Sequence, residues 1–233
     1  MRQRRLRTDR RSSLVVLVVA SLLMSCATSS SADGRLGSGA WLLGLELQER
    51  EFDTMSAGDS RPIPRGESGV RLSVDRLLST AWAFGLSGHF GGAWLDWSDP
   101  VYNTSGKIED TGWSTRVGVD RVFALGEGGT GFAGIGIEYG EAHSWLHTLG
   151  VDPATGLGGQ NISDEGPRCY MTGGYARFLA VTPAWRGVAG CAQVSASIYG
   201  AHASDPPFGL RYDWLGRSLA VSAGLRFVVA RGK

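Results

Sequence analysis

The sequence predicts an all-β protein, an eight-stranded antiparallel up-and-down transmembrane β-barrel. Three observations predict this fold class: apolar residues recur with a period of two in eight segments, the connections alternate long and short, and the tryptophans lie near segment ends. Successive side chains of a strand point to opposite faces, so a period of two indicates strands rather than helices. A chain of 233 residues is long enough for one domain of this kind.

The segment with the clearest alternation is TGFAGIGIEYGEAHSW, residues 130–145. From Ala133 to Tyr139 its odd positions are apolar, whereas its even positions are glycine, glycine and glutamate. A strand in a soluble core does not usually combine two glycines and a glutamate on its second face. Small residues beside one charge suit a narrow polar interior, and the apolar face then points to lipid.

Seven further strands are predicted on the same grounds. The four that come first alternate large apolar residues with small or polar ones; they are residues 40–51, 68–78, 81–94 and 111–125. In the first of them, a tryptophan and three leucines oppose Gly44, Glu46 and Gln48. The three that follow residues 130–145 are residues 167–181, 187–199 and 212–230. The strand at 167–181 is the least regular, because Tyr175 and Phe178 fall on opposite faces.

The connections between these strands alternate in length. Four are long and polar, and they are residues 52–67, 96–110, 148–166 and 201–211. An antiparallel meander places all of them at one end, the loop end, and the short ones at the other, the turn end, as in outer-membrane barrels. The tryptophans divide between the ends, with Trp41, Trp82 and Trp185 at the turn end and Trp94, Trp97, Trp113, Trp145 and Trp214 at the loop end. Amphipathic rings favour membrane interfaces, so two aromatic girdles are expected.

The N-terminal region predicts export. Residues 1–11 are strongly basic and residues 14–23 form an apolar run, the order typical of a secretory signal peptide. We expect a signal peptide at 1–27, a linker at 28–39 and the barrel at 40–230. In an alternative, LMSC resembles a bacterial lipobox, which implies a lipoprotein signal at 1–25 and lipidation of Cys26.

Composition excludes several other classes of protein. A formal net charge of +1 leaves no electrostatic footprint for nucleic acid. The 35 glycines lack a Gly-X-Y period, which excludes collagen, and they disfavour a helical bundle. We expect no disulfide between Cys169 and Cys191, because the turn between them sets them out of register and, on this assignment, on opposite faces.

These features together resemble the small eight-stranded outer-membrane barrels of the OmpA and OmpX type, over about residues 40–230. The resemblance implies location in the cell outer membrane, contact with outer-membrane lipid and folding by the barrel assembly machinery. It implies a structural, surface-interaction or limited small-solute permeation role, porin-like in architecture and without enzyme activity. One departure is the C-terminus: such barrels commonly end on an aromatic residue, whereas VVARGK follows Phe227 here.

The inward face of the predicted barrel carries charges of both signs. They are Glu46, Arg71, Asp75, Arg116, Asp120, Glu138 and Arg226. An eight-stranded barrel is just wide enough to be filled by side chains. A turn near Glu127 places Arg116 across from Glu138. We expect such pairs to neutralise buried charge and plug the lumen, and the alternative is a gated or ion-selective pore.

No metal or cofactor is expected from the sequence. His89 is predicted to face inward, without a second histidine or cysteine at ligand spacing. His143 and His147 are four residues apart, but at a strand end this spacing does not build the metal-binding face that it builds on a helix.

An enzyme is one alternative from a different functional class. The sequence HAS at residues 202–204 resembles the His-x-Ser arrangement of barrel lipid A deacylases, which implies His202 as the base and Ser204 as the nucleophile. The sequence departs from that family at the next position, where Asp205 replaces an asparagine. No glutamate follows Ser204, so Asp205 or Asp213 is left to orient the histidine.

A soluble lipocalin-like carrier of an apolar ligand is a further alternative. The sequence GAW at residues 39–41 matches the G-x-W of the first lipocalin strand. A lipocalin turns its apolar face inward around its ligand and ends with a helix, for which this chain has no 3.6-residue pattern.

Overall fold

The computed structural model describes residues 36–54, 66–99, 104–126, 128–151, 158–205 and 210–229. The predicted signal peptide, Cys26 and the linker up to residue 35 lie outside the described residues. Within the described ranges, no helix is long and apolar enough to cross a membrane.

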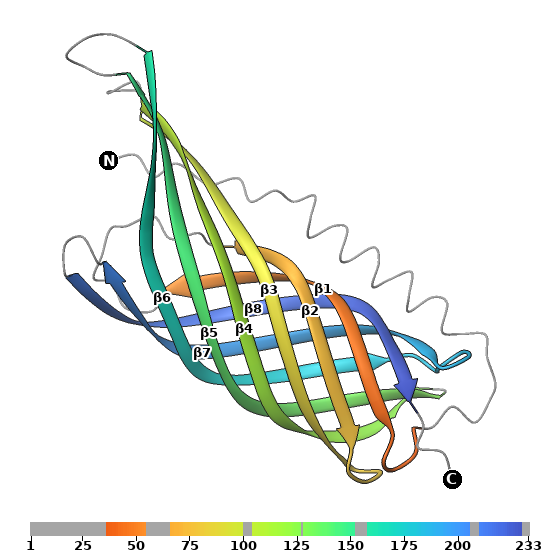
Figure 1. The fold of residues 1–233 in the computed structure, drawn as a ribbon. Helices are drawn as coiled ribbons and strands as arrows, with labels where there is room; N and C mark the ends of the chain where they lie inside the picture. Colours follow the sequence, from red (N-terminus) through yellow and green to blue (C-terminus); the bar gives the residue numbers. More distant parts are fainter. Residues whose placement is uncertain are drawn as a thin grey trace.

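Eight strands form one closed antiparallel barrel in the order of the chain (Figure 1). They are β1 (Trp41–Thr54), β2 (Gly66–Leu77), β3 (Trp82–Asp99), β4 (Thr104–Leu125), β5 (Gly129–Val151), β6 (Gly158–Val181), β7 (Val188–Asp205) and β8 (Leu210–Val229). β1 closes the barrel by pairing with β8, from Trp41 opposite Val229 to Thr54 opposite Gly216. The predicted fold class is therefore confirmed.

Side chains alternate between the two faces of the barrel wall. On β1, Leu45 is 48% exposed and Glu46 is 1% exposed, and on β5, Ile137 is 69% exposed and Glu138 is 3% exposed. The exposed face is thus apolar and the buried face polar, which is the reverse of a soluble protein. This arrangement fits a barrel wall in lipid. It is opposite to that of a lipocalin-like carrier, whose apolar face lines the interior.

Three short turns lie at the turn end of the barrel, at the lower right of Figure 1, and they span residues 78–81, 126–128 and 182–187. In the β4–β5 turn, Gly126 and Gly128 have φ angles of 58° and 80°. Glycine adopts these left-handed conformations without strain, which lets the chain reverse tightly. The connections at the loop end include residues that lie outside the described part of the chain.

Strands β3–β6 extend further than the sequence predicts, and Figure 1 shows them continuing together beyond the other strands. The prediction of long loops at 96–110 and 148–166 is wrong for most of these residues. Pairing of β3 with β4 continues to Asp99 opposite Thr104, and pairing of β4 with β5 continues to Ser105 opposite Leu149. Backbone hydrogen bonds maintain this ladder after the apolar alternation has ended, so no sequence pattern marks it.

The irregular pattern of the sixth predicted strand also has a structural explanation. Met171, Tyr175 and Leu179 are buried in the barrel interior, whereas Phe178 is 44% exposed on the outside. Large side chains therefore occupy both faces of β6. A pattern of large and small residues does not reveal the face of such a strand.

Two facing glycines leave room for the ring of Tyr175 inside the barrel. Gly118 on β4 and Gly136 on β5 are register partners. A Cβ atom on Gly136 would lie 2.7 Å from Cε1 of Tyr175 and 2.7 Å from Cα of Gly118. Such distances exclude a side chain at this position unless the ring or the backbone moves.

We predict that Gly136→Ala lowers the free energy of unfolding by about 1–3 kcal/mol, because the added methyl group would clash with the backbone oxygen of Val117 and with the ring of Tyr175. Gly174→Ala on the adjacent strand is the control, since its Cβ would contact only the backbone oxygen of Gly136, at 3.8 Å. Reversible urea unfolding of the refolded protein in lipid vesicles measures both variants. Equal unfolding free energies would contradict the packing argument.

Candidate functional site

The candidate site is the barrel interior, where nine arginine, aspartate and glutamate side chains of the described residues are buried. They are Glu46, Arg50, Arg71, Asp75, Arg116, Asp120, Glu138, Arg177 and Arg226, each at most 5% exposed. The structure places all seven charged residues of the sequence prediction in this set. The structure adds two residues to this set, Arg50 and Arg177, that the sequence prediction did not include.

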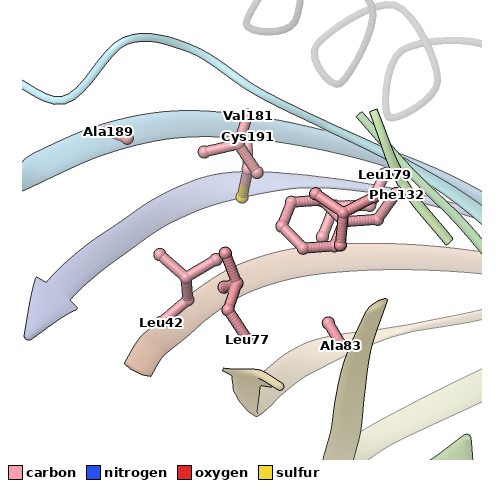
Figure 2. Close-up of a cluster of buried hydrophobic side chains, with 9 residues drawn as sticks. Leu42, Leu77, Ala83, Phe132, Leu179, Val181, Ala189 and Cys191 are labelled. Carbon is pink, nitrogen blue, oxygen red and sulfur yellow. The ribbon is translucent and has the colours of Figure 1, made fainter. Parts of the chain in front are cut away.

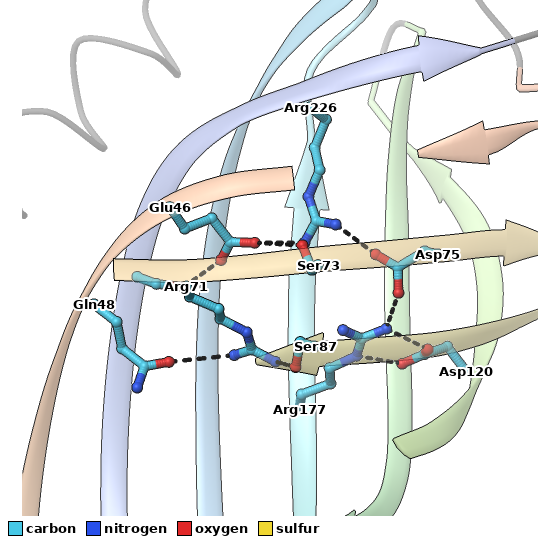
Figure 3. A network of polar contacts seen from close by, with 10 residues as sticks. Glu46, Gln48, Arg71, Ser73, Asp75, Ser87, Asp120, Arg177 and Arg226 are labelled. Atoms are coloured by element: carbon cyan, nitrogen blue, oxygen red, sulfur yellow. Dashed lines mark hydrogen bonds and ion pairs between the residues drawn. The ribbon is translucent and has the colours of Figure 1, made fainter. Parts of the chain in front are cut away.

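Asp75 on β2 joins two arginines from other sides of the lumen (Figure 3). Its Oδ1 accepts a hydrogen bond from Nη2 of Arg177 on β6 at 2.5 Å, and its Oδ2 accepts one from Nη1 of Arg226 on β8 at 2.5 Å. All three side chains are at most 2% exposed. One carboxylate thus partly compensates two guanidiniums and connects three strands across the lumen.

Each of these arginines also has a second carboxylate partner. Nη2 of Arg226 donates to Oε1 of Glu46 at 2.6 Å. Nε of Arg177 donates to Oδ1 of Asp120 at 2.8 Å, and its Nη2 donates to Oδ2 at 2.6 Å. Paired N–H donors on one carboxylate make a bidentate contact, which fixes geometry as well as charge. The result is a continuous ionic chain across the lumen: Glu46, Arg226, Asp75, Arg177, Asp120.

A second network is centred on Glu138 of β5. Arg50 donates to Oε1 of Glu138 from Nη1 at 2.8 Å and to Oε2 from Nη2 at 3.2 Å. Arg116 lies with its Nη2 3.2 Å from Oε2, and Ser197 donates to the same oxygen at 2.8 Å. Arg116 and Glu138 are register partners, as the predicted position of the β4–β5 turn requires. Arg116 also donates to Ser195 at 2.8 Å, so neutral hydroxyls complete its coordination.

Arg71 differs from the other four arginines because its hydrogen bonds go to neutral side chains. Its Nη2 donates to Oγ of Ser87 at 2.7 Å, and its Nη1 donates to Oε1 of Gln48 at 3.4 Å. Glu46 is its register partner on β1, and the two oxygens of Glu46 accept hydrogen bonds from Ser73 and Ser222 in addition to the contact with Arg226. Five arginines and four carboxylates give the nine residues a formal charge of +1.

An apolar layer lies on the turn-end side of the ionic chain. Figure 2 shows its side chains gathered between the strands. Its buried members come from seven strands, and they are Leu42, Leu77, Ala83, Val122, Phe132, Leu179, Val181, Ala189 and Cys191. Val228 of β8 packs against them. Leu42, Phe132 and Leu179 are 0% exposed, so this layer separates the charged residues from solvent at the turn end.

A smaller apolar group lies toward the loop end. Met171, Tyr199 and Ala201 are buried there, and Phe52 packs against them. The guanidinium carbon of Arg50 lies 4.7 Å from the centroid of the Phe52 ring, a cation–π contact. The second network is therefore covered by aromatic and apolar side chains on its loop-end side.

His89 faces inward, as the sequence predicts, and its Nδ1 lies 2.7 Å from Oε1 of Glu67. The histidine side chain is 5% exposed. Among the described residues, no three or more histidine, cysteine, aspartate or glutamate side chains group in a way that could hold a metal ion. The contact with Glu67 gives His89 a partner of opposite charge when the imidazole is protonated.

The two residues of the predicted His-x-Ser arrangement lie on β7 near the loop end. Nδ1 of His202 lies 2.6 Å from Oδ1 of its register partner Asp213 on β8, and the two side chains are 44% and 79% exposed. They belong to a shallow surface groove lined by Tyr170, Thr172, Gly200, Ala201, His202, Asp213 and Leu215. The backbone of Ser204 pairs with Arg168, and its side chain lies outside the described part of the structure.

The structure corrects one expectation for the cysteines. Cys169 and Cys191 both belong to the inward face, because Cys169 packs against the loop-end apolar group and Cys191 is part of the turn-end layer. They form no disulfide, since Cys191 lies opposite Val181 and Cys169 lies opposite Ala203. The expectation of opposite faces is wrong because the face of β6 could not be assigned from its pattern.

The sequence contains a signal for one of the two omitted arginines, Arg50, but not for the other, Arg177. Arg50 lies within the predicted first strand and shares the parity of Glu46 and Gln48, so the same alternation already predicts that it faces inward. Arg177 shares the parity of Tyr175, but Phe178 beside it is equally large. Assigning β6 to the correct face therefore needs the three-dimensional register.

Comparison with solved structures reveals similarity in fold. OprG from Pseudomonas aeruginosa matches over 85% of this chain and 99% of its own, with 8% identity and a TM-score of 0.57. A major outer membrane protein from Thermus thermophilus matches over 82% and 99%, with 12% identity and a TM-score of 0.46. Ail of Yersinia pestis matches over 82% and 99%, with 14% identity and a TM-score of 0.36. No protein-family model matches the sequence, and no curated protein matches it.

We predict that Asp75→Asn lowers the free energy of unfolding by about 3–5 kcal/mol, because it leaves two buried guanidiniums without their shared carboxylate. Glu49→Gln is the matched control. It removes one carboxylate of β1 that lies outside the network and contacts Ser68 at 3.5 Å. Urea unfolding in vesicles measures both variants, and a loss of similar size for both would contradict a special role of the ionic chain.

Proposed function

We propose that this chain, an eight-stranded β-barrel of the outer-membrane type, is an integral outer-membrane protein with a closed lumen that presents a β-sheet at the cell surface. The observation that carries the proposal is the filled interior. Ionic networks occupy the middle of the lumen and an apolar layer lies at its turn end. A barrel filled in this way serves as a scaffold in the membrane rather than as an open channel.

The outer surface supports a position in lipid. Every strand from β1 to β8 has at least one exposed leucine, isoleucine, valine or phenylalanine, as in Leu47 (64% exposed), Phe90 (60%) and Ile198 (59%). Water is absent from the bilayer core, so backbone groups there must pair within the protein, which a closed barrel achieves. Outer-membrane lipid and the barrel assembly machinery are therefore the partners that we propose.

All eight strands exceed the length that a bilayer requires, and three of them exceed it most. β4, β5 and β6 contain 22, 23 and 24 residues, whereas a tilted transmembrane strand needs about 9–11. Roughly half of each strand thus extends beyond the bilayer at the loop end. In barrels of this type the short turns face the periplasm, so we place the extension outside the cell.

The extension has two sheet edges in the described part of the chain. Pairing of β3 with β2 ends at Gly92, and pairing of β6 with β7 begins at Arg168. Residues 93–99 of β3 and 160–165 of β6 thus have register partners on one side only among the described residues. An exposed strand edge can accept a strand of another chain, so surface interaction is the role that we propose for the extension.

We predict that the purified protein migrates faster in unheated than in boiled detergent gels and forms no steady conductance in planar bilayers. Glu138→Gln breaks part of the second network. The lumen of this variant should nevertheless stay closed, because the apolar layer at the turn end does not depend on Glu138. A conductance that appears in Glu138→Gln and not in Glu49→Gln would support limited solute passage instead. Release of the protein into the soluble periplasmic fraction, with no gel shift, would refute the membrane location.

The contact between His202 and Asp213 favours a second candidate function, hydrolysis of an acyl ester of lipid A. In this reaction Ser204 would attack the ester carbonyl while His202 takes its hydroxyl proton, and Asp213 would orient the imidazole. The ester C–O bond would break, and His202 would give the proton to the leaving sugar or hydroxyacyl oxygen. A water molecule would then hydrolyse the acyl-serine, which releases the fatty acid and restores Ser204. The surface groove beside His202 lies on the outer face of the wall, where a lipid chain could reach it.

If this second function holds, lipid A from cells producing the protein should lack one acyl chain, and His202→Ala should restore it. Asp213→Asn should reduce the effect, because its side chain still reaches His202 but no longer stabilises the protonated imidazole. Mass spectrometry of extracted lipid A measures the acyl chains. An identical lipid A pattern with and without the protein would refute the hydrolase function, and only the scaffold function would remain.

A further inference from the structure

The outward-facing charged residues that the structure describes at the turn end are all arginines, and each one contacts a tryptophan. Among the described residues of the turn-end half of the wall, those that are charged and exposed are Arg76, Arg121 and Arg186. Each has its guanidinium carbon over a tryptophan ring, and the three Arg–Trp pairs are called the arginine rim below.

Two of the pairs are built by strand register. Arg76 on β2 lies opposite Trp41 on β1, with the guanidinium carbon 5.1 Å from the ring centroid. Arg121 on β4 lies opposite Trp82 on β3, at 5.3 Å. Both tryptophans are exposed, at 40% and 49%, so the pairs lie on the outer surface of the barrel.

The third pair lies in the β6–β7 turn. The guanidinium carbon of Arg186 is 4.7 Å from the ring centroid of Trp185, and Trp185 is 67% exposed. Arg186 has a φ angle of 50°, a left-handed conformation that is uncommon outside glycine. The turn therefore places an arginine and a tryptophan side by side at the same end as the two cross-strand pairs.

The outer surface at the loop end has a different charge pattern. Its described outward residues include carboxylates as well as arginines: Glu49, Glu51, Glu141, Arg168, Asp213 and Arg217. Among the described outward residues, carboxylates therefore occur at the loop end and not in the turn-end half of the wall. The described outward charges of the turn end are thus positive.

We propose that the arginine rim binds the phosphate groups of anionic phospholipids in the leaflet next to the short turns. This inference rests on the proposed membrane function. A tryptophan ring favours the interface between hydrocarbon and head groups. A guanidinium that stacks on the face of the tryptophan ring still has free N–H donors along the guanidinium edge. These donors can bind two phosphate oxygens in a bidentate manner.

The surface below each cross-strand pair matches the rest of a phospholipid. The next outward residue toward the bilayer centre is Leu43 on β1 and Phe84 on β3, which are both 42% exposed. Val119, the next on β4, is 47% exposed. A lipid whose phosphate contacts the arginine would therefore lay its acyl chains on apolar side chains.

The distribution of the pairs favours lipid over a protein partner. The pairs lie at β1–β2, at β3–β4 and at the β6–β7 turn, so they are spread around the barrel rather than gathered on one side. A docked protein would cover one side of the rim. A ring of lipids surrounds the whole barrel and can occupy all three positions.

The test compares two double variants that each remove two outward positive charges. Arg76→Gln/Arg121→Gln alters the turn end, and Arg168→Gln/Arg217→Gln alters the loop end. The folded proteins are incubated in detergent with equal amounts of phosphatidylglycerol and phosphatidylcholine, and native mass spectrometry counts the lipids retained. We expect the wild type and the loop-end variant to prefer phosphatidylglycerol, and the turn-end variant to lose this preference by about fivefold for each arginine removed.

Each outcome has a clear meaning, because a heat-dependent gel shift first establishes that every variant is a closed barrel. An absent shift in the wild type would count against the membrane function itself, apart from any lipid preference. Equal retention of phosphatidylglycerol by both variants in closed barrels would overturn the inference. Equal loss in both variants would also overturn it, since general positive charge and not the arginine rim would then hold the lipid.

Discussion

Closure of the sheet between β1 and β8 is the constraint on which the rest of the structure depends. A bilayer offers no water to backbone N–H and C=O groups, so a sheet that crosses it can leave no strand edge unpaired in the hydrocarbon layer. Eight strands close around a lumen that side chains fill. Inward positions must therefore be small or must find partners, which explains the glycines beside Tyr175 and the serines beside Arg116.

Within this narrow lumen, charge compensation also selects which residues face inward. Asp75 links Arg177 and Arg226, so β2, β6 and β8 are held together although none of them is a neighbour of another in the barrel order. Burial of ions costs free energy that the ion pairs offset only in part, and removal of one partner leaves the other uncompensated. The network therefore adds little net stability to the native register. Its larger effect is to destabilise any other register, in which these charges would be separated and left without partners.

The two ends of the barrel carry different surfaces because they meet different surroundings. At the turn end, an apolar layer separates the lumen from solvent and arginines lie over tryptophans on the outside. At the loop end, β3–β6 continue as a sheet with unpaired edges in its described residues. Anchoring by the proposed lipid contacts at one end would hold this sheet at a defined height above the bilayer, where a partner could reach it.

Local patterns in the chain were enough to identify eight strands, the two ends and seven of the nine buried charges, because side-chain alternation is a property of each strand alone. Even the Arg116–Glu138 contact follows from a tight turn. The face of β6 and the full length of β3–β6 needed the structure, since large residues on both faces and polar ladders leave no periodic signal. The contact of Asp75 with Arg177, 102 residues away, exists only because closure brings opposite walls of the lumen together.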